Sequence, residues 1–165
     1  MIVLHQPVSD DNRHAAKAHL DEILHVLSKP GGFAKLSTVQ RKFLMGVVLA
    51  AIVPVDNRIR NIELERLQVL LKGSLHINGT VALESLALAE GQNDLGPAIV
   101  TIAKALPELL GIEDRCVLIA HLWELALCDD ELHNYEDQLV YKVADLSGVP
   151  RKKVAELMAR AAARA

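Results

Sequence analysis

The sequence predicts an all-α protein, a compact bundle of about seven to eight helices. Apolar residues make up 51% of the chain, but aromatic residues only 3%. The core must therefore be built from Leu, Ile, Val and Ala, and Ala and Leu are strong helix formers. Apolar residues also recur three and four positions apart along most of the chain, and no segment alternates cleanly enough to predict a strand.

Length and charge favour a single domain without nucleic-acid binding. The 165 residues suit one domain or two tightly packed halves. The net charge of -3 predicts no general basic surface of the kind that nucleic acids require. Basic residues do gather on the last predicted helix, and we interpret them as a solvated face. They are Arg151, Lys152, Lys153, Arg160 and Arg164.

Neither a membrane span nor a signal peptide is expected, which favours the cytoplasm. The longest apolar run, Phe43–Val55, contains Pro54 and is shorter than the ~20 residues of a spanning helix. Met1–Leu4 is apolar but too short for a signal peptide. Cys116 and Cys128 lie in one apolar stretch, where a helix would hold their Cα atoms about 18 Å apart, so we expect two reduced thiols rather than a disulfide.

Capping residues, glycines and prolines set the predicted helix boundaries. Pro107 is expected to bend or break the chain, and Pro150 is expected in the first turn of the last helix. The second predicted helix is apolar almost all round, which places it at the centre. The predicted helices run from Ser9 to Leu27, Ser37 to Val53, Asn61 to Gly73, Gly79 to Ala89, Asn93 or Asp94 to Leu106, Glu113 to Leu127, Asn134 to Ser147, and from Val149 onward.

A shift of about 73 residues aligns two segments of the chain, about 37–73 and about 112–148. Each segment has an apolar helix, an acidic loop with one apolar residue, an Asn, a Glu and an amphipathic helix. This pattern predicts an internal pseudo-twofold repeat of helix–acidic loop–helix. The aligned pairs are Leu49 with Leu122, Ile52 with Leu125, Asp56 with Asp129, Ile59 with Leu132, Asn61 with Asn134, Glu63 with Glu136, Leu67 with Val140, and Leu70 with Val143.

The Asn and Glu that the two units share have a physical reason. Asn61 and Asn134 are suitable N-caps for the second helix of each unit. Glu63 and Glu136 then fall in the first turn, where the helix dipole favours a carboxylate.

The second unit resembles the TerB-like signature of tellurite-resistance proteins. The residues that carry the resemblance are Leu122–Ala126 and Asp129–Asp137, which match an apolar helix, an Ala-Asp-Gly-Glu-Leu loop and a helix opening with Glu. Val143–Val149 resembles the usual ending of the motif, and Ala50–Leu71 resembles a worn copy of it. The resemblance covers about residues 37–155 and is strongest in the last third. It implies one TerB-like domain over 1–165, all-helical, non-enzymatic and associated with tellurite resistance and stress.

The resemblance also implies a divalent-metal site in the acidic loops, at Asp56, Glu63, Asp129 and Glu136. The glycine of the motif is replaced by Asn57 in one copy and by Asp130 in the other. The acid that follows is kept as Glu131 but replaced by Arg58 in the first copy, where Arg58 and Arg60 would repel a cation.

The densest group of metal ligands in the sequence lies in the second loop. It comprises Asp129, Asp130, Glu131, His133 and Glu136. Carboxylate oxygens suit Ca²⁺, Mg²⁺ or Mn²⁺, and His133 extends the choice to Zn²⁺. The spacing is not that of an EF-hand, because Leu132 and Tyr135 interrupt it. The alternative, helix caps with a solvated acidic loop and no cofactor, stays open.

No sequence motif predicts an enzyme. The chain lacks a glycine-rich phosphate loop, a Gly-x-Ser-x-Gly elbow and a His-Glu-x-x-His helix. His121 could hydrogen-bond Glu124 three residues on, and Trp123 is expected in the core. Two functions follow: a TerB-like module that binds a cation, or a metal-free interaction domain that uses its acidic face or an apolar groove. An unidentified protein partner is expected, and a homodimer is left open.

Overall fold

The computed structural model describes residues 10–52, 60–73, 85, 88, 96–127 and 134–164. These residues form seven α-helices and one 3-10 helix and contain no strand, which confirms the all-α prediction. The elements are α1 (Asp10–Leu27), η1 (Gly32–Lys35), α2 (Thr38–Ala50), α3 (Arg60–Gly73), α5 (Gly96–Leu109), α6 (Ile112–Ala126), α7 (Asn134–Ser147) and α8 (Arg151–Arg164). The helix predicted over Gly79–Ala89 lies outside the described residues except for Ser85 and Leu88, which are helical and buried.

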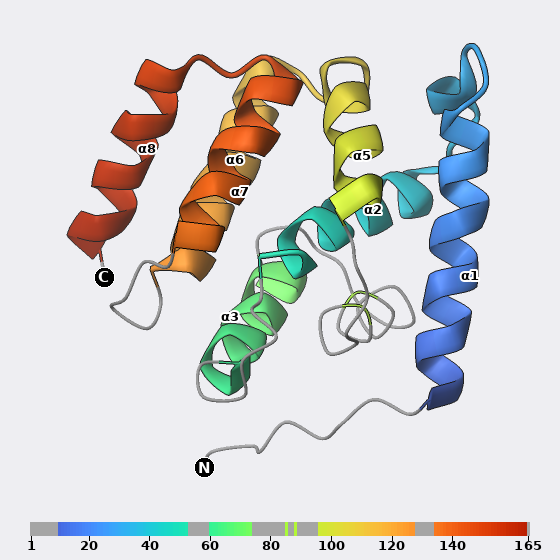
Figure 1. Cartoon of the computed structure of the whole chain (residues 1–165), viewed down its shortest axis with the longest axis horizontal. Coiled ribbons are helices and arrows are strands. Elements are labelled where there is room, and N and C mark those ends of the chain that lie inside the picture. Colours follow the sequence, from blue (N-terminus) through green and yellow to red (C-terminus); the bar gives the residue numbers. More distant parts are fainter. Residues whose placement is uncertain are drawn as a thin grey trace.

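The helices are arranged around α6. Figure 1 shows α1 and α8 at opposite ends of the molecule, with the other helices between them. Helix α6 packs against α7 and α8 on one side and against α2, α3 and α5 on the other. Helix α5 packs against α1, α2 and α7. The two halves of the chain are therefore joined through α6 and α5.

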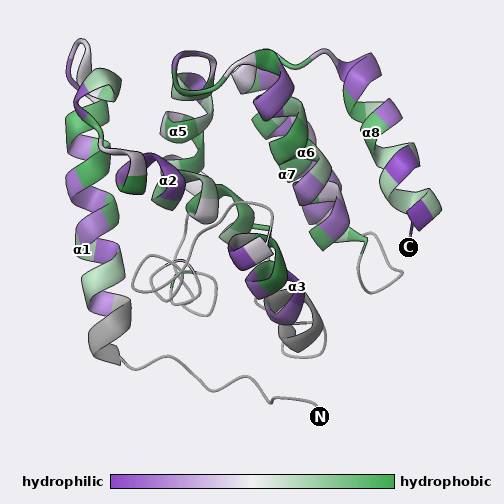
Figure 2. Cartoon of the chain, turned by 180° about the vertical axis from the view of Figure 1, so that it is seen from behind, coloured by the Kyte–Doolittle hydropathy of each residue, from purple (hydrophilic) through white to green (hydrophobic). Residues whose placement is uncertain are grey.

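The core is aliphatic, as the composition predicts. Residues 43–52 of α2 and its C-terminal turn are buried without a break, which confirms the central place expected for this helix. Among the described side chains, the aromatic residues Phe43 and Trp123 are fully buried. Phe43 also stacks on the His19 ring of α1, with 4.6 Å between ring centroids. Figure 2 shows α1 and α8 carrying both hydrophilic and hydrophobic residues, as helices at the two ends of a bundle should.

Those apolar positions of the predicted repeat that the structure describes are buried in both units. These residues are Leu49, Ile52, Leu67 and Leu70 in the first unit, and Leu122, Leu125, Val140 and Val143 in the second. Residues 53–59 and 128–133, which contain both acidic loops, lie outside the described residues. The pseudo-twofold relation between the units therefore stays a prediction.

Helix α2 begins with a reciprocal capping box. The Ser37 hydroxyl accepts a hydrogen bond from the backbone N–H of Gln40 at 3.1 Å. The Gln40 side chain in turn accepts one from the backbone N–H of Ser37 at 2.8 Å. Two of the amides that a helix start leaves unpaired are thus satisfied, which fixes the boundary that the sequence predicts.

At two prolines the helix boundaries differ from those predicted. Helix α5 continues through Pro107 to Leu109, so the chain does not break there, and the alternative of a bend stays a prediction. The missing N–H of Pro107 removes one hydrogen bond from the helix, and the burial of Leu106 and Leu109 keeps the last turn helical. Pro150 does not lie inside α8 but just before it, where its carbonyl accepts a hydrogen bond from the N–H of Val154 at 3.1 Å.

Helix α7 ends in a Schellman motif at Gly148. The N–H of Val149 donates to the carbonyl of Ala144 at 2.9 Å, and the N–H of Gly148 donates to that of Asp145 at 3.4 Å. Gly148 has φ +76°, and an added Cβ would lie 3.3 Å from the Arg115 guanidinium. That guanidinium donates to the carbonyl of the last residue of α7. The turn thus requires glycine for both its conformation and its space.

We predict that Gly148→Ala destabilises the protein by about 1–2 kcal/mol, because an L residue in the left-handed region is strained. The matched control is Gly73→Ala at the end of α3, where an added Cβ meets nothing within 4 Å. That change should be neutral or stabilising by less than about 1 kcal/mol. Urea unfolding followed by circular dichroism measures both, and equal effects would contradict the role of the left-handed turn.

Candidate functional site

The structure describes the side chain of one predicted metal ligand, Glu136. Five others, Asp56, Asp129, Asp130, Glu131 and His133, lie outside the described residues. Glu63 lies in α3, but its side chain is not described. Within the described part of the chain, no three His, Cys, Asp or Glu side chains are grouped to hold a metal ion.

Glu136 lies in the first turn of α7 with its side chain fully buried, at 0% exposure. Burying an ionised carboxylate costs several kcal/mol unless other groups compensate for the lost water. The dipole of α7 supplies part of that compensation. Glu136 also has a polar interaction within the chain. The depth of this carboxylate distinguishes it from an ordinary solvated first-turn acid such as the half-buried Asp137.

The acidic segment 128–133 connects the end of α6 to the start of α7, which pack against each other. Its donor set is chemically suited to a divalent cation, because carboxylates and one imidazole are ligands that such ions accept. The first loop does not fit, since Arg58 and Arg60 stand among its few acids. By residue chemistry alone the second loop fits the expected metal site better than the first, and the site itself stays a prediction.

His121 and Glu124 approach each other near the end of α6, but without the predicted hydrogen bond. The His121 Nδ1 lies 3.5 Å from the Glu124 Oε1, and His121 is 8% exposed. Neither ring nitrogen has a hydrogen-bond partner among the described residues. The pair is thus an ion pair only when the imidazole is protonated.

Trp123 ties α6 to α7 and α8. Its indole Nε1–H donates to the carbonyl of Val154 in α8 at 3.2 Å. The Tyr141 ring of α7 meets the indole edge-on, with 5.9 Å between centroids and 79° between planes. The Arg151 guanidinium lies 5.3 Å from the centre of the Tyr141 ring and donates to both carboxylate oxygens of Asp145. This hydrogen bonding raises the pKa of Arg151.

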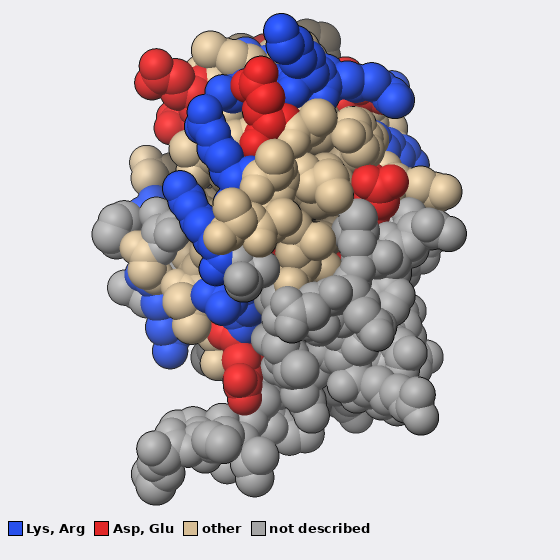
Figure 3. Space-filling model, turned by 90° about the vertical axis from the view of Figure 1, so that its left-hand side faces the viewer, with Lys and Arg blue, Asp and Glu red and all other residues tan. Residues whose placement is uncertain are grey.

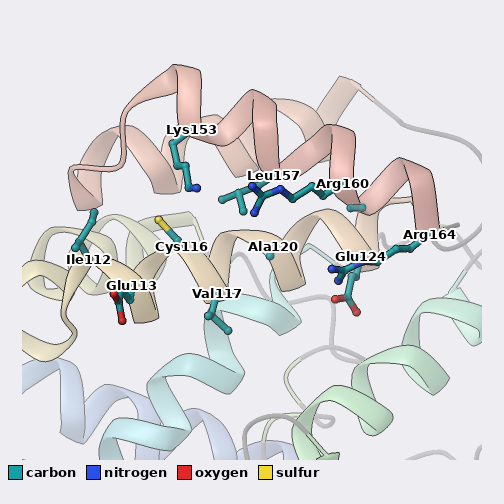
Figure 4. Close-up of a pocket in the computed structure, with 11 residues that line it drawn as sticks. Ile112, Glu113, Cys116, Val117, Ala120, Glu124, Lys153, Leu157, Arg160 and Arg164 are labelled. Atoms are coloured by element: carbon teal, nitrogen blue, oxygen red, sulfur yellow. The ribbon is translucent and has the colours of Figure 1, made fainter.

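A groove of about 450 Å³ runs between α6 and α8 (Figure 4). Its floor is apolar, and Ile112 and Val117 at its edge are 47% and 48% exposed. Figure 3, viewed from the side of α8, shows an uncharged surface with Lys and Arg along its left and top and with Asp and Glu at its top and right. The groove is lined by Ile112, Glu113, Cys116, Val117, Ala120 and Glu124 of α6 and by Lys153, Leu157, Arg160, Ala161 and Arg164 of α8.

Sequence reasoning interpreted the basic residues of α8 as a solvated face and so missed this groove. The signal was their spacing, because Lys153, Leu157, Arg160 and Arg164 fall at i, i+4, i+7 and i+11 of one helical face. Three cations thus share a face with an apolar residue that is only 8% exposed. Cys116, on the opposite wall, is a free, half-buried thiol as expected.

The fold and the acidic segment define a class of protein, an all-helical module with an acid-rich connection between two packed helices. The sequence profile of the family described as "Tellurite resistance protein TerB" matches residues 43–159. This range runs from the central helix α2 into α8 and includes α6, the acidic segment and α7. The chain belongs to the TerB family.

Comparisons with curated proteins and with solved structures find no significant match in either set. Among the helices that the structure describes, none is long and apolar enough to cross a membrane.

We predict that Trp123→Phe destabilises the protein by about 1–3 kcal/mol, because it removes the bond to Val154 and leaves unfilled space in the core. The control is Val39→Ala on α2, where the side chain is 54% exposed. That change should stay within about 0.5 kcal/mol. Because Trp123 is the single tryptophan, unfolding should be followed by circular dichroism. A Trp123→Phe variant as stable as the control would show that the indole contact contributes little.

Proposed function

We propose that this TerB-family chain is a non-enzymatic, cytoplasmic module of tellurite resistance and stress response that binds a divalent cation. The site is the acidic segment between α6 and α7, with Asp129, Asp130, Glu131, His133 and Glu136 as its ligands. The observation that carries the proposal is the complete burial of Glu136 beside that segment.

A cation near Glu136 would act on the packing of α6 against α7. The Glu136 carboxylate belongs to the first turn of α7, and the acidic segment before α7 follows directly on α6. A ligand stabilises whichever arrangement of the two helices it binds best. Cation binding would in this way change the stability of the helix pair without any chemical reaction.

A second candidate function, a metal-free interaction domain, is favoured by the apolar groove between α6 and α8. The two functions use different residues of α6 and its neighbours, so one chain can carry both.

We predict that one of Ca²⁺, Mg²⁺, Mn²⁺ and Zn²⁺ raises the thermal midpoint relative to EDTA. A ligand at 100 times its dissociation constant adds about 2.7 kcal/mol, which is about 5–10 °C for a chain of this size. The Asp129→Asn/Glu136→Gln double variant should lose the shift, because it removes two anionic ligands and keeps the side-chain volumes.

Two control variants make this result specific. Asp129→Asn alone should weaken the shift without touching the buried position. Asp114→Asn/Glu156→Gln removes the same charge from exposed positions of α6 and α8 and should keep the full shift. No shift with any of the four ions would reject the cation site, and an equal shift in every variant would place the cation elsewhere.

A further inference from the structure

The α6–α8 groove is hollow because small residues form its floor. Cys116 and Ala120 face α8 (Figure 4), and Ala161 of α8 also lines the groove. Leu157 is the largest apolar side chain that α8 contributes to the lining. Between Ile112 and Glu124 the groove follows α6 for about 18 Å, about three helical turns. Its shape therefore calls for a convex, elongated and apolar occupant.

A second copy of the chain fits this shape poorly. A two-fold contact would place the same surface on both sides of the interface. Two hollow faces with alanine at their centres would enclose unfilled space, which costs contact energy. An α-helix with a stripe of large apolar side chains is convex and fills such a groove.

The unbalanced charge of the groove is positive. The lining carries three basic side chains, Lys153, Arg160 and Arg164, all on α8, and two acidic ones, Glu113 and Glu124, both on α6. Lys153 lies 3.8 Å from Glu156 of its own helix. Arg160 and Arg164, in contrast, form no ion pair with any residue that the structure describes. A partner gains most by carrying carboxylates on the side that faces α8.

We propose that the α6–α8 groove binds an amphipathic helix of a partner protein, with large apolar side chains on the groove floor and acidic residues toward α8. This inference rests on the second candidate function and not on the cation site. Arg160 and Arg164 select the charge of the partner helix, and the alanine floor selects its shape.

The test uses the full chain in EDTA and two labelled synthetic helical peptides of equal length. Both carry Leu at i, i+4, i+7 and i+11, with Glu along one flank in the first and Lys in the second. Fluorescence anisotropy should show tighter binding of the Glu peptide. The double variant Arg160→Glu/Arg164→Glu should lower the affinity for the Glu peptide about tenfold and raise the affinity for the Lys peptide. The control Lys142→Glu/Lys152→Glu makes the same charge change outside the groove and should leave this preference in place.

Groove filling tests the shape requirement separately. Ala120→Phe fills the floor of the groove and should lower the affinity for the Glu peptide about tenfold or more, because the Leu side chains of the peptide then have no space. Ala155→Phe, on the exposed side of α8, should have no effect, and circular dichroism confirms that both variants fold. Equal binding of the two peptides, or binding that survives Ala120→Phe, overturns the proposal. So does a dimer that Ala120→Phe dissociates, or binding of dodecanoate in place of the peptide. Because EDTA is present throughout, none of these outcomes depends on the cation site.

Discussion

Helix α6 has to satisfy packing on nearly all of its sides, and this constraint organises the molecule. It contacts the N-terminal half through α2 and α3 and the C-terminal half through α7 and α8. An aromatic-poor core has few large side chains to span such distances, and Trp123 is one that reaches α8 with a hydrogen bond. The C-terminal end of α6 leads into the acidic segment, and its remaining open edge forms one wall of the groove. Both candidate sites are therefore consequences of where α6 is held.

Local chemistry explains why most helix boundaries could be predicted from the sequence. The capping box at Ser37 and the left-handed turn at Gly148 depend on residues within a few positions of one another. The chain break expected at Pro107 was wrong because tertiary burial, and not local propensity, keeps this turn helical. Leu106 and Leu109 are held in the core on either side of the proline, and their packing outweighs one missing hydrogen bond. Propensity is a weak guide wherever neighbouring helices supply that much contact.

The two candidate sites also differ in how much of each is local in sequence and how much depends on tertiary packing. The acidic pattern is local in sequence, so the first-turn position of Glu136 could be predicted, whereas the ligand set stays a prediction. The burial of Glu136 could not, because it depends on how α7 is turned against its neighbours. The groove was harder to predict from the sequence, because its walls are separated along the chain by the whole of α7. The spacing of Lys153, Arg160 and Arg164 shows a shared face, but only the packing of α8 on α6 shows what that face meets.

The acidic segment and the groove share α6, yet its packing argues that they act independently. Coupling between two sites requires an element with two arrangements that both ligands bias. Close-packed interiors resist small continuous shifts, and α6 is enclosed by helices on several sides. A cation beside Glu136 would act at the α6–α7 end, whereas a helix in the groove would contact side chains that already project from α6 and α8. A rearrangement that broke the Trp123–Val154 bond would change both surfaces together, because that bond joins α6, which leads into the acidic segment, to α8, which forms the other wall of the groove.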